Sequence, residues 1–160
     1  MNIFHLHKVP KVCAEYHCDK HVVKMILETA QMLSTAYQRH CGLDDELYKP
    51  AYPKHPMTIW VGDSVENFTY TWYLGTHLGL QYTKRYRKIH KSNLIINKFN
   101  FDRFQNIEKK FPMKKFTAPP QCMPDEYKHE NYITAYRQYY IGEKKRFAKY
   151  TRVDIPHFMC

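Results

Sequence analysis

The most regular hydrophobic pattern in the chain lies between residues 19 and 40. Apolar side chains recur there at three- and four-residue steps, at Val22, Val23, Ile26, Leu27, Ala30, Leu33, Ala36 and Tyr37. This period is typical of an amphipathic α-helix. Asp19 is placed to cap such a helix at its start, and Gly42 is placed to end it. The pattern therefore predicts one long helix from Asp19 to about His40.

A second long helix is predicted from Asp63 or Ser64 towards Ile89. Its expected buried stripe consists of Val65, Phe68, Trp72, Leu78 and Tyr82. Gly75 and Gly79 stand one helical turn apart, which lowers helix propensity but lets another backbone approach closely. Shorter helices are expected over 11–16, after Ser92, and over 130–140, the last resuming after Gly142 towards residue 150.

The remaining segments lack a helical period. Residues 2–7 alternate apolar and polar, which favours a short strand or an extended arm. Prolines interrupt 43–58 and 112–124, so both are expected to be loops. We therefore predict a mainly α protein. Residues 1–160 would form a single compact helical domain with a short N-terminal extended segment and proline-rich loops.

Cysteine content and hydropathy favour a protein that stays in the cytoplasm. No apolar run approaches the roughly 20 residues of a membrane span, and the first seven residues are too short and polar for a signal peptide. No membrane partner is therefore expected. The five cysteines are an odd number without a CxxC pair, so reduced thiols are the simplest expectation.

The positive charge of the chain is concentrated in one stretch. Residues 81–115 hold 11 basic and 2 acidic groups, a net of +9, whereas the whole chain carries +10. Such a concentration costs self-repulsion unless a polyanion offsets it. The charge therefore predicts a nucleic-acid partner, with DNA favoured. The alternative is a solvated basic face that only keeps the protein in solution.

Within that stretch, residues 82–91 interleave cations with aromatic side chains. On a continued helix Lys84, Arg87, Lys88 and Lys91 would share a side and could contact phosphates. The predicted nucleic-acid-binding residues are Lys84, Arg85, Arg87, Lys88, His90, Lys91 and Arg137. Such contacts fix position without reading base sequence. The tyrosines of the segment, Tyr82 and Tyr86, are better explained as core residues with a hydrated hydroxyl.

The first long helix also presents a polar line. His17, His21, Lys24, Glu28 and Gln31 are separated by four, three, four and three residues, which aligns them along one side. Histidine, lysine and glutamate within hydrogen-bonding reach are the groups that acid–base catalysis uses. The line therefore predicts a catalytic site facing solvent or a cleft. The alternative is an ordinary solvated face with a Lys24–Glu28 ion pair.

A metal site is not expected, although His17 and His21 have ligand spacing on a helix. The metalloprotease motif with this spacing needs a glutamate directly after its first histidine, and Cys18 stands there. Further ligands at convincing spacing are missing. We therefore predict neither a metal nor any other cofactor.

Two further groups near the C-terminal region are candidates. Asp125 and Glu126 follow a proline loop, where they either begin a helix or act as a general acid near the basic groove. A tyrosine cluster follows, at positions 132, 136, 139 and 140. Most of it is expected to be packing, although a tyrosine that reaches a cleft could stack on an extruded base.

Four segments carry a resemblance to other proteins. They are Cys18–Ala36, His55 to Trp60, Arg85–Ser92 and Met123–Lys149, and together they resemble a group of small phage-type proteins associated with DNA repair or base modification. More distantly, the small size, basic charge and His55-Pro loop before a long helix are similar to the pyrimidine-dimer DNA glycosylases.

The glycosylase resemblance implies an amine nucleophile that attacks the sugar C1′ with a glutamate nearby, on an extruded nucleotide. In that family the amine is exposed when the first methionine is removed before a small residue. Here Asn2 follows Met1, so removal is not expected and the nucleophile is not carried over. Lys20 or Lys24 could substitute, with Glu28 as the carboxylate.

Three functions follow as hypotheses. The first is a DNA glycosylase or lyase that acts on a damaged or modified base. The second is a non-catalytic DNA- or RNA-binding module, and the third is an enzyme of free nucleotides. The five scattered glycines contain no phosphate-binding loop, which argues against a P-loop version of the third.

Overall fold

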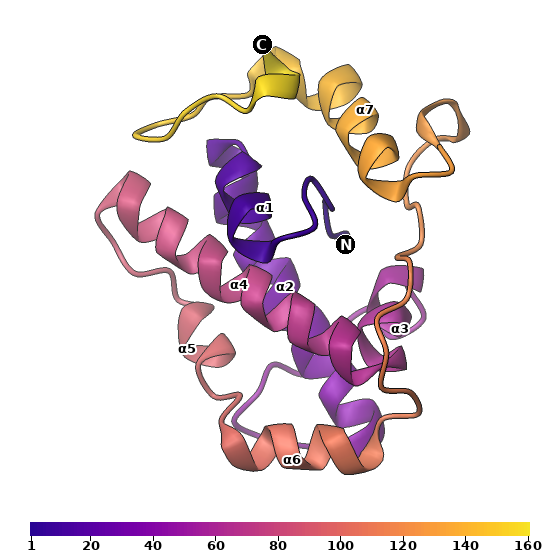
Figure 1. Cartoon of the computed structure of the whole chain (residues 1–160). Helices are drawn as coiled ribbons and strands as arrows, with labels where there is room; N and C mark the ends of the chain where they lie inside the picture. The colour runs from indigo at the N-terminus through magenta and orange to yellow at the C-terminus, as the bar shows by residue number, and fades with distance from the viewer.

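The computed structural model describes residues 1–160 and contains seven α-helices and no strand, which confirms the mainly α prediction. Figure 1 shows α2 and α4 crossing at the centre, α6 at one end and α7 at the other. The helices are α1 (Pro10–Tyr16), α2 (Asp19–Cys41), α3 (Pro56–Asp63), α4 (Val65–Tyr86), α5 (Asn93–Ile96), α6 (Phe101–Lys110) and α7 (Tyr132–Lys144), with single 3-10 turns at Asp125–Tyr127, Lys145–Phe147 and His157–Met159.

The core forms where α2 packs on α4. Its members include Val22, Ile26 and Leu33 from α2 and Phe68 and Leu78 from α4, all buried. All five belong to the predicted apolar stripes, so the helical period predicted correctly that they are buried. Burial of such side chains contributes about 1.5–3 kcal/mol each.

Gly75 marks the point of closest approach. A Cβ atom there would lie 2.9 Å from Thr29 Cγ2 on α2 and 3.0 Å from Ile96 Cδ1 on α5. At Gly79 a Cβ would collide with the Asn93 side chain. Both glycines thus permit close packing on α4 as predicted, but the neighbours are side chains rather than another backbone.

The N-terminal segment is a buried arm and not a strand. Ile3, Phe4 and Leu6 are buried, and the Phe4 ring contacts His21 of α2 and Tyr140 of α7. Polar contacts hold its backbone: Tyr70 Oη donates to the His7 carbonyl at 3.1 Å, and Arg137 Nε donates to the Leu6 carbonyl at 2.9 Å. These contacts come from helices far away in sequence, so the alternation pattern alone could not place the arm.

Several predicted boundaries were wrong. The predicted loop over 43–58 ends earlier, because α3 begins at Pro56, where proline fits the first turn. The second long helix does not reach Ile89, since Arg87 adopts a left-handed conformation (φ 58°) and ends α4. The helix after Ser92 is only Asn93–Ile96, and α6 was missed altogether.

The last helix is also more regular than predicted. It runs from Asn131, whose side chain caps it, through Gly142 to Lys144. Gly142 does not interrupt α7. Instead it makes room for the Tyr127 ring, since a Cβ there would lie 2.5 Å from Tyr127 Oη.

Asp19 does not cap α2, because Cys18 occupies that position. Asp19 accepts hydrogen bonds from Arg85 Nη1 at 3.1 Å and from Thr151 Oγ1 at 2.7 Å. Arg85 also donates to the Glu15 and His17 carbonyls and to Gln81. The buried guanidinium therefore joins α1, α2 and α4, and Asp19 links this group to the C-terminal segment.

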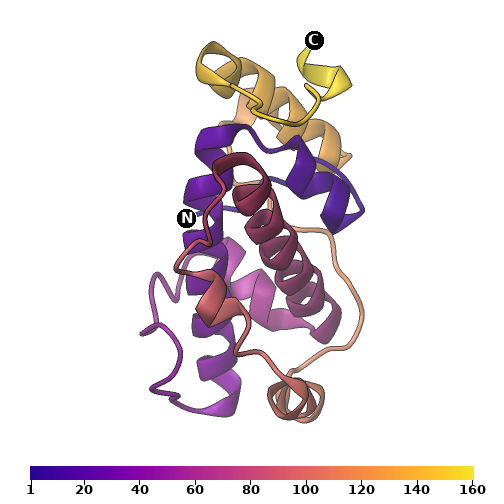
Figure 2. The same ribbon diagram turned by 90° about the vertical axis from the view of Figure 1, so that its left-hand side faces the viewer.

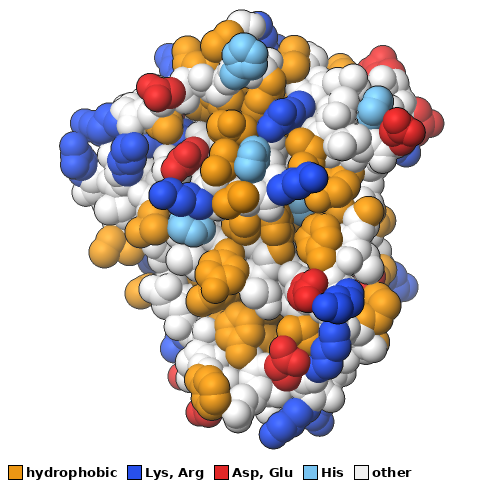
Figure 3. Space-filling view, in the orientation of Figure 1, with side chains coloured by type: hydrophobic (Ala, Val, Ile, Leu, Met, Phe, Trp, Pro, Cys, Tyr) orange, Lys and Arg blue, Asp and Glu red, His pale blue; other side chains and the backbone are white.

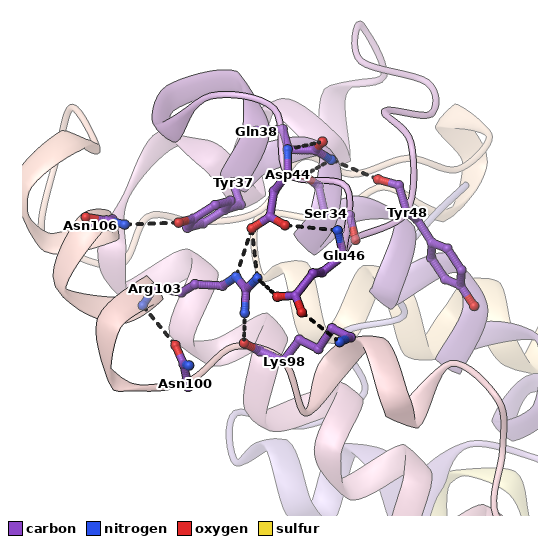
Figure 4. A network of polar contacts seen from close by, with 10 residues as sticks. All are labelled: Ser34, Tyr37, Gln38, Asp44, Glu46, Tyr48, Lys98, Asn100, Arg103 and Asn106. Atoms are coloured by element: carbon purple, nitrogen blue, oxygen red, sulfur yellow. Dashed lines mark hydrogen bonds and ion pairs between the residues drawn. The ribbon is translucent and has the colours of Figure 1, made fainter.

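A polar network closes the other end of the molecule (Figure 4). Arg103 on α6 donates to Asp44 at 2.9 Å and to Glu46 at 2.5 Å, and Lys98 pairs with Glu46. Gln38 on α2 donates to the Tyr48 carbonyl at 2.8 Å. The loop between α2 and α3 is thus tied to α6. None of the helices has the length and apolar composition needed to cross a bilayer.

Candidate functional site

A cavity of about 270 Å³ lies where the N-terminal arm meets α2 and α7. In Figure 2 the N-terminus and α2 lie together on the left-hand side of the molecule. The lining residues come from five segments: Met1, Asn2 and Phe4; His21, Lys24, Met25 and Glu28; His55; Cys122; and Tyr139 and Lys144.

Glu28 is the centre of this cavity, and two amines contact it. The α-amine of Met1 lies 3.5 Å from Oε2, and Lys24 Nζ lies 3.4 Å from Oε1. The backbone N–H of Asn2 donates to Oε2 at 2.9 Å. The Met1 side chain is 2% exposed, whereas the Lys24 side chain is 66% exposed. A nearly buried carboxylate therefore has two amines within 3.5 Å.

Two histidines in the cavity are neutral at physiological pH. The His21 ring stacks on Phe4 with centroids 4.6 Å apart, and burial lowers its pKa to about 3, helped by His17, Lys144 and Lys24. Burial and the Met1 amine lower the pKa of His55, while Glu28 opposes the shift. A neutral imidazole has one hydrogen-bond donor and one acceptor, so both rings suit hydrogen bonding to a polar ligand.

The charge of the cavity favours an anionic ligand. The Met1 amine, Lys24 and Lys144 are basic, and Glu28 is the one acidic residue of the lining. The Tyr139 ring adds an aromatic surface beside them, with Lys144 Nζ 4.9 Å from its centroid. A ligand with a phosphate and a flat ring would satisfy both features.

The structure brings together three of the predicted catalytic residues. His21, Lys24 and Glu28 all line the cavity, so of the two alternatives, solvent or a cleft, these three side chains face a cleft. His17 lies before α2 and is completely buried, with Nδ1 2.7 Å from the Cys13 carbonyl. Lys20 lies outside the lining, over the Phe147 ring at 5.1 Å. Neither can contact a ligand in this cavity as predicted.

The acidic pair at Asp125 and Glu126 is also placed elsewhere. Both side chains are exposed on a 3-10 turn, and Asp125 pairs with Lys128 at 2.7 Å. They neither begin α7 nor line the cavity. The prediction of an acid beside the basic groove was therefore wrong, because the turn projects into solvent.

The predicted nucleic-acid-binding residues are divided by the fold. Arg85 is 1% exposed and its guanidinium is engaged by the core network, so it cannot hold a phosphate. Arg137 is half-buried against the Leu6 carbonyl and the Phe158 ring. Lys84 lines a separate hollow of about 680 Å³ with Glu15 and Asp154.

Only the loop after α4 keeps the predicted character. Arg87, Lys88 and Lys91 are exposed and none forms an ion pair. His90 is half-buried, and its ring lies edge-on against Tyr82 at 5.0 Å. The prediction that Lys84, Arg87, Lys88 and Lys91 share one helical side was wrong, because α4 ends at Tyr86.

The rest of the basic stretch does not form a common concave surface. Lys98 and Arg103 pair with Glu46 and Asp44, Lys114 pairs with Glu108, and Lys115 approaches Glu66. On the face drawn in Figure 3, Lys and Arg side chains are spread over several places and not gathered in one field. The idea that the whole of 81–115 meets phosphate is therefore wrong, and residues 87–91 hold the exposed, unpaired cations that lie together on one loop.

Five cavity residues were not predicted as site residues. Met1, His55, Cys122, Tyr139 and Lys144 come together only through the fold, although Tyr139 belonged to the predicted tyrosine cluster. Nowhere do three or more histidine, cysteine or acidic side chains gather as a metal site would require. Comparison of the chain with protein-family models, with curated proteins and with solved structures found no match.

Proposed function

We propose that this protein is a DNA glycosylase with lyase activity, acting on a damaged or modified base through the cavity around Glu28. The observation that carries the proposal is the buried carboxylate with two amines within 3.5 Å of it. An amine beside a carboxylate is the pairing needed for imine chemistry at a sugar carbon. The same pairing is what the resemblance to the pyrimidine-dimer DNA glycosylases implies.

The proposed reaction needs no external oxidant or reductant. Glu28 accepts a proton from the amine, and the freed nitrogen lone pair forms a bond to C1′ of the nucleotide. The bond from C1′ to the base breaks, and the base leaves with the electron pair and takes the proton from Glu28, which is ionised again. Ring opening gives an imine, and removal of a C2′ proton by Glu28 then expels the 3′ phosphate. Water releases the enzyme from the imine.

The α-amine of Met1 is the better candidate for the nucleophile. The Met1 side chain, 2% exposed, anchors it at the cavity wall, whereas the Lys24 side chain is 66% exposed. Should Met1 be removed, the nitrogen of Asn2, which lies 2.9 Å from Glu28 Oε2, becomes the amine.

Replacing Glu28 with glutamine is expected to lower borohydride-trapped adduct and strand cleavage by about 10²–10⁴-fold, the usual contribution of a general base. Glutamine keeps the shape and can still accept the Asn2 hydrogen bond, so the fold should be retained. The measurement is gel separation of trapped complexes on duplexes with an abasic site or a pyrimidine dimer. Unchanged trapping by Glu28→Gln would contradict the proposal.

Mapping the trapped peptide separates the two amines. Reduction fixes the sugar to the nucleophile, and mass spectrometry is expected to find it on the first residue. Lys24→Met is the matched control, because it removes the second amine and should keep adduct formation within about threefold. An adduct on Lys24 would keep the proposed function but reassign the nucleophile.

A second candidate is a non-catalytic nucleic-acid-binding module. The exposed cations of 87–91 favour it, because none of them lines the cavity. A module of this kind would bind DNA with a steep salt dependence. It would give no adduct on any lesion, and its binding would be indifferent to Glu28→Gln.

A further inference from the structure

His55, the residue before α3, is held in one tautomer by a hydrogen bond to the backbone. Its Nδ1 atom accepts from the Met57 N–H at 3.1 Å, and the side chain thereby caps α3. An imidazole nitrogen that accepts a hydrogen bond carries no proton, so the proton of the neutral ring lies on Nε2. His55 therefore presents a single N–H donor, and the start of α3 fixes its position.

This donor has no partner within the protein. The His55 side chain is half-buried and lines the cavity around Glu28. The hydrogen bonds of His55 use its backbone and Nδ1 and leave Nε2 free. Nor is Nε2 buried, as the unpartnered ring nitrogens of His5 are. With Nδ1 directed at the backbone of α3, Nε2 is the ring nitrogen left to face the cavity.

The ring stays neutral while it donates. A second proton would have to sit on Nδ1, where it would displace the hydrogen bond from Met57 and remove the cap of α3. A neutral imidazole is a very weak acid. His55 can therefore stabilise negative charge on a ligand through a hydrogen bond, but it does not give up its proton.

The groups of the proposed reaction share the cavity with this donor. The Met1 amine lies 3.5 Å from Glu28 Oε2, and both residues line the cavity together with His55. The Met1 amine and Glu28 are also the charges that act on the pKa of His55. His21, the other neutral ring of the lining, stands seven residues before Glu28 on α2, which is about two helical turns or roughly 10 Å. His55 is therefore the imidazole available beside the amine and the carboxylate.

We propose that His55 donates a hydrogen bond from Nε2 to the sugar ring oxygen, O4′, of the nucleotide held in the cavity. The assignment rests on the proposed function, because O4′ is the oxygen on the carbon that the amine attacks. A fixed donor aimed at an atom that gains negative charge stabilises the transition state. His55 would thus assist opening of the sugar ring and favour the binding of a nucleotide that has a ring oxygen.

The ring-opening step balances with Glu28 as the carrier of the proton. After the base has left, Glu28 takes the second proton from the nitrogen bound to C1′. The lone pair of that nitrogen forms the C=N bond, the C1′–O4′ bond breaks, and O4′ takes the electron pair. Glu28 then gives its proton to O4′, which becomes a hydroxyl group. His55 keeps its own proton throughout, and its hydrogen bond to O4′ strengthens as charge develops there.

The binding of two duplexes tests this contact without catalysis. One carries a tetrahydrofuran abasic analogue, and the other carries a cyclopentane analogue that differs from it in the ring oxygen alone. The unchanged protein is expected to bind the tetrahydrofuran duplex about three- to tenfold more tightly, the usual effect of one hydrogen bond. His55→Asn should bind both duplexes equally, because asparagine can cap α3 but its amide ends near the position of Nδ1.

Two further variants separate the donor from the cap. His55→Gln places an amide nitrogen near the position of Nε2 and offers no equivalent of Nδ1, so it should keep most of the preference while its melting temperature falls. His129→Asn is the matched control, because His129 Nδ1 accepts from the Asn131 N–H at 3.0 Å in the same way and lies outside the cavity. It should leave the preference unchanged. Equal binding of the two duplexes by the unchanged protein, or a preference that persists in His55→Asn, would overturn the proposal.

Failure of this contact can be distinguished from failure of the proposed function. A preference for the tetrahydrofuran duplex that depends on His55, without a borohydride-trapped adduct on any lesion, would keep the contact and remove the glycosylase. An adduct without such a preference would keep the glycosylase and remove the contact. Where the adduct forms, His55→Asn should slow it about 10²-fold on an abasic site and spare an acyclic aldehyde analogue, which has no ring to open. Equal slowing on both would overturn the proposal.

Discussion

Replacing Arg85 with methionine is expected to lower the free energy of unfolding by about 3–5 kcal/mol, the usual cost of removing one partner of a buried ion pair. The guanidinium donates to Asp19 Oδ1 at 3.1 Å and to the His17 carbonyl at 2.7 Å. Methionine fills a similar volume but donates no hydrogen bond. It would leave Asp19 and two carbonyls with donors missing. Urea unfolding followed by circular dichroism measures the loss.

Lys88→Met is the matched control for this prediction, because it removes an exposed cation a short distance along the chain. A substitution at such a surface position should change stability by no more than about 0.5 kcal/mol. The two variants should differ in DNA affinity. Lys88→Met should weaken binding because Lys88 is exposed on the loop after α4, whereas Arg85→Met should leave the affinity of the folded protein unchanged because Arg85 is buried. If Arg85→Met kept the free energy of unfolding of the unchanged protein but lost DNA affinity, Arg85 would be a phosphate ligand after all.

The contrast between Arg85 and Lys88 shows where prediction from sequence stops. Charge patterning marked both as phosphate ligands, because both lie in a segment rich in cations. Burial depends on where α4 ends and what faces it. Asp19 faces Arg85 and was predicted to be a helix cap. A pairing across 66 residues cannot be derived from local spacing.

The spacing of apolar residues located helices correctly where it repeated over many residues. It located α2 and most of α4, and it aligned His21, Lys24 and Glu28 on a side that does face a cavity. It failed for α6, whose ten residues include exposed charges and only one buried residue, Ile107. Such a short helix depends on its contacts with the rest of the fold more than on its own sequence.

The candidate site was predictable in part for the same reason. Three of its side chains belong to one helix, so their spacing brings them together wherever the helix lies. Apart from Met25, which is also on α2, the other members come from the N-terminal arm, the loop before α3, the loop before α7 and α7 itself, and only tertiary packing joins them. The Met1 amine is the clearest omission, because the N-terminal amine was set aside in favour of Lys20 or Lys24 on the ground that Asn2 follows Met1.

Acidification is expected to unfold the protein between about pH 4 and 5. Burial lowers the pKa of His5 to about 3 and that of His17 to about 4, and the pKa of His21 is likewise about 3. Both ring nitrogens of His5 and Nε2 of His17 are buried without a hydrogen-bond partner, and the contact of His17 Nδ1 with the Cys13 carbonyl offsets the effect of burial only in part. In the unfolded chain each histidine binds a proton near pH 6.5.

The sign of the effect follows from proton linkage. Above pH 6.5 the three rings are neutral in both states, and their contribution to stability is fully present. Below pH 6.5 the unfolded chain binds protons that the folded protein does not, so each ring removes about 1.4 kcal/mol per pH unit. At pH 4.5 the combined loss is about 8 kcal/mol by the same relation, which is comparable with the total stability of a domain.

The slope of the unfolding free energy against pH tests whether the buried histidines cause acid unfolding, and the test does not depend on the absolute stability of each variant. Between pH 6 and 5, His5→Gln should reduce the slope by about 1.4 kcal/mol per pH unit, even where the substitution itself destabilises the protein. His129→Gln is the control, because His129 is exposed and lies outside the core. Equal slopes for all three proteins would show that the buried rings already carry protons in the folded state.

This acid limit also affects how a pH–activity profile must be read. A fall in DNA cleavage below pH 5 would look like loss of the general base, yet unfolding driven by His5, His17 and His21 is expected in the same range. His5→Gln separates the two, because His5 does not line the cavity. If the acid limb of cleavage moves with the unfolding midpoint of that variant, the limb reports folding, and the proton on Glu28 must be measured by spectroscopy instead.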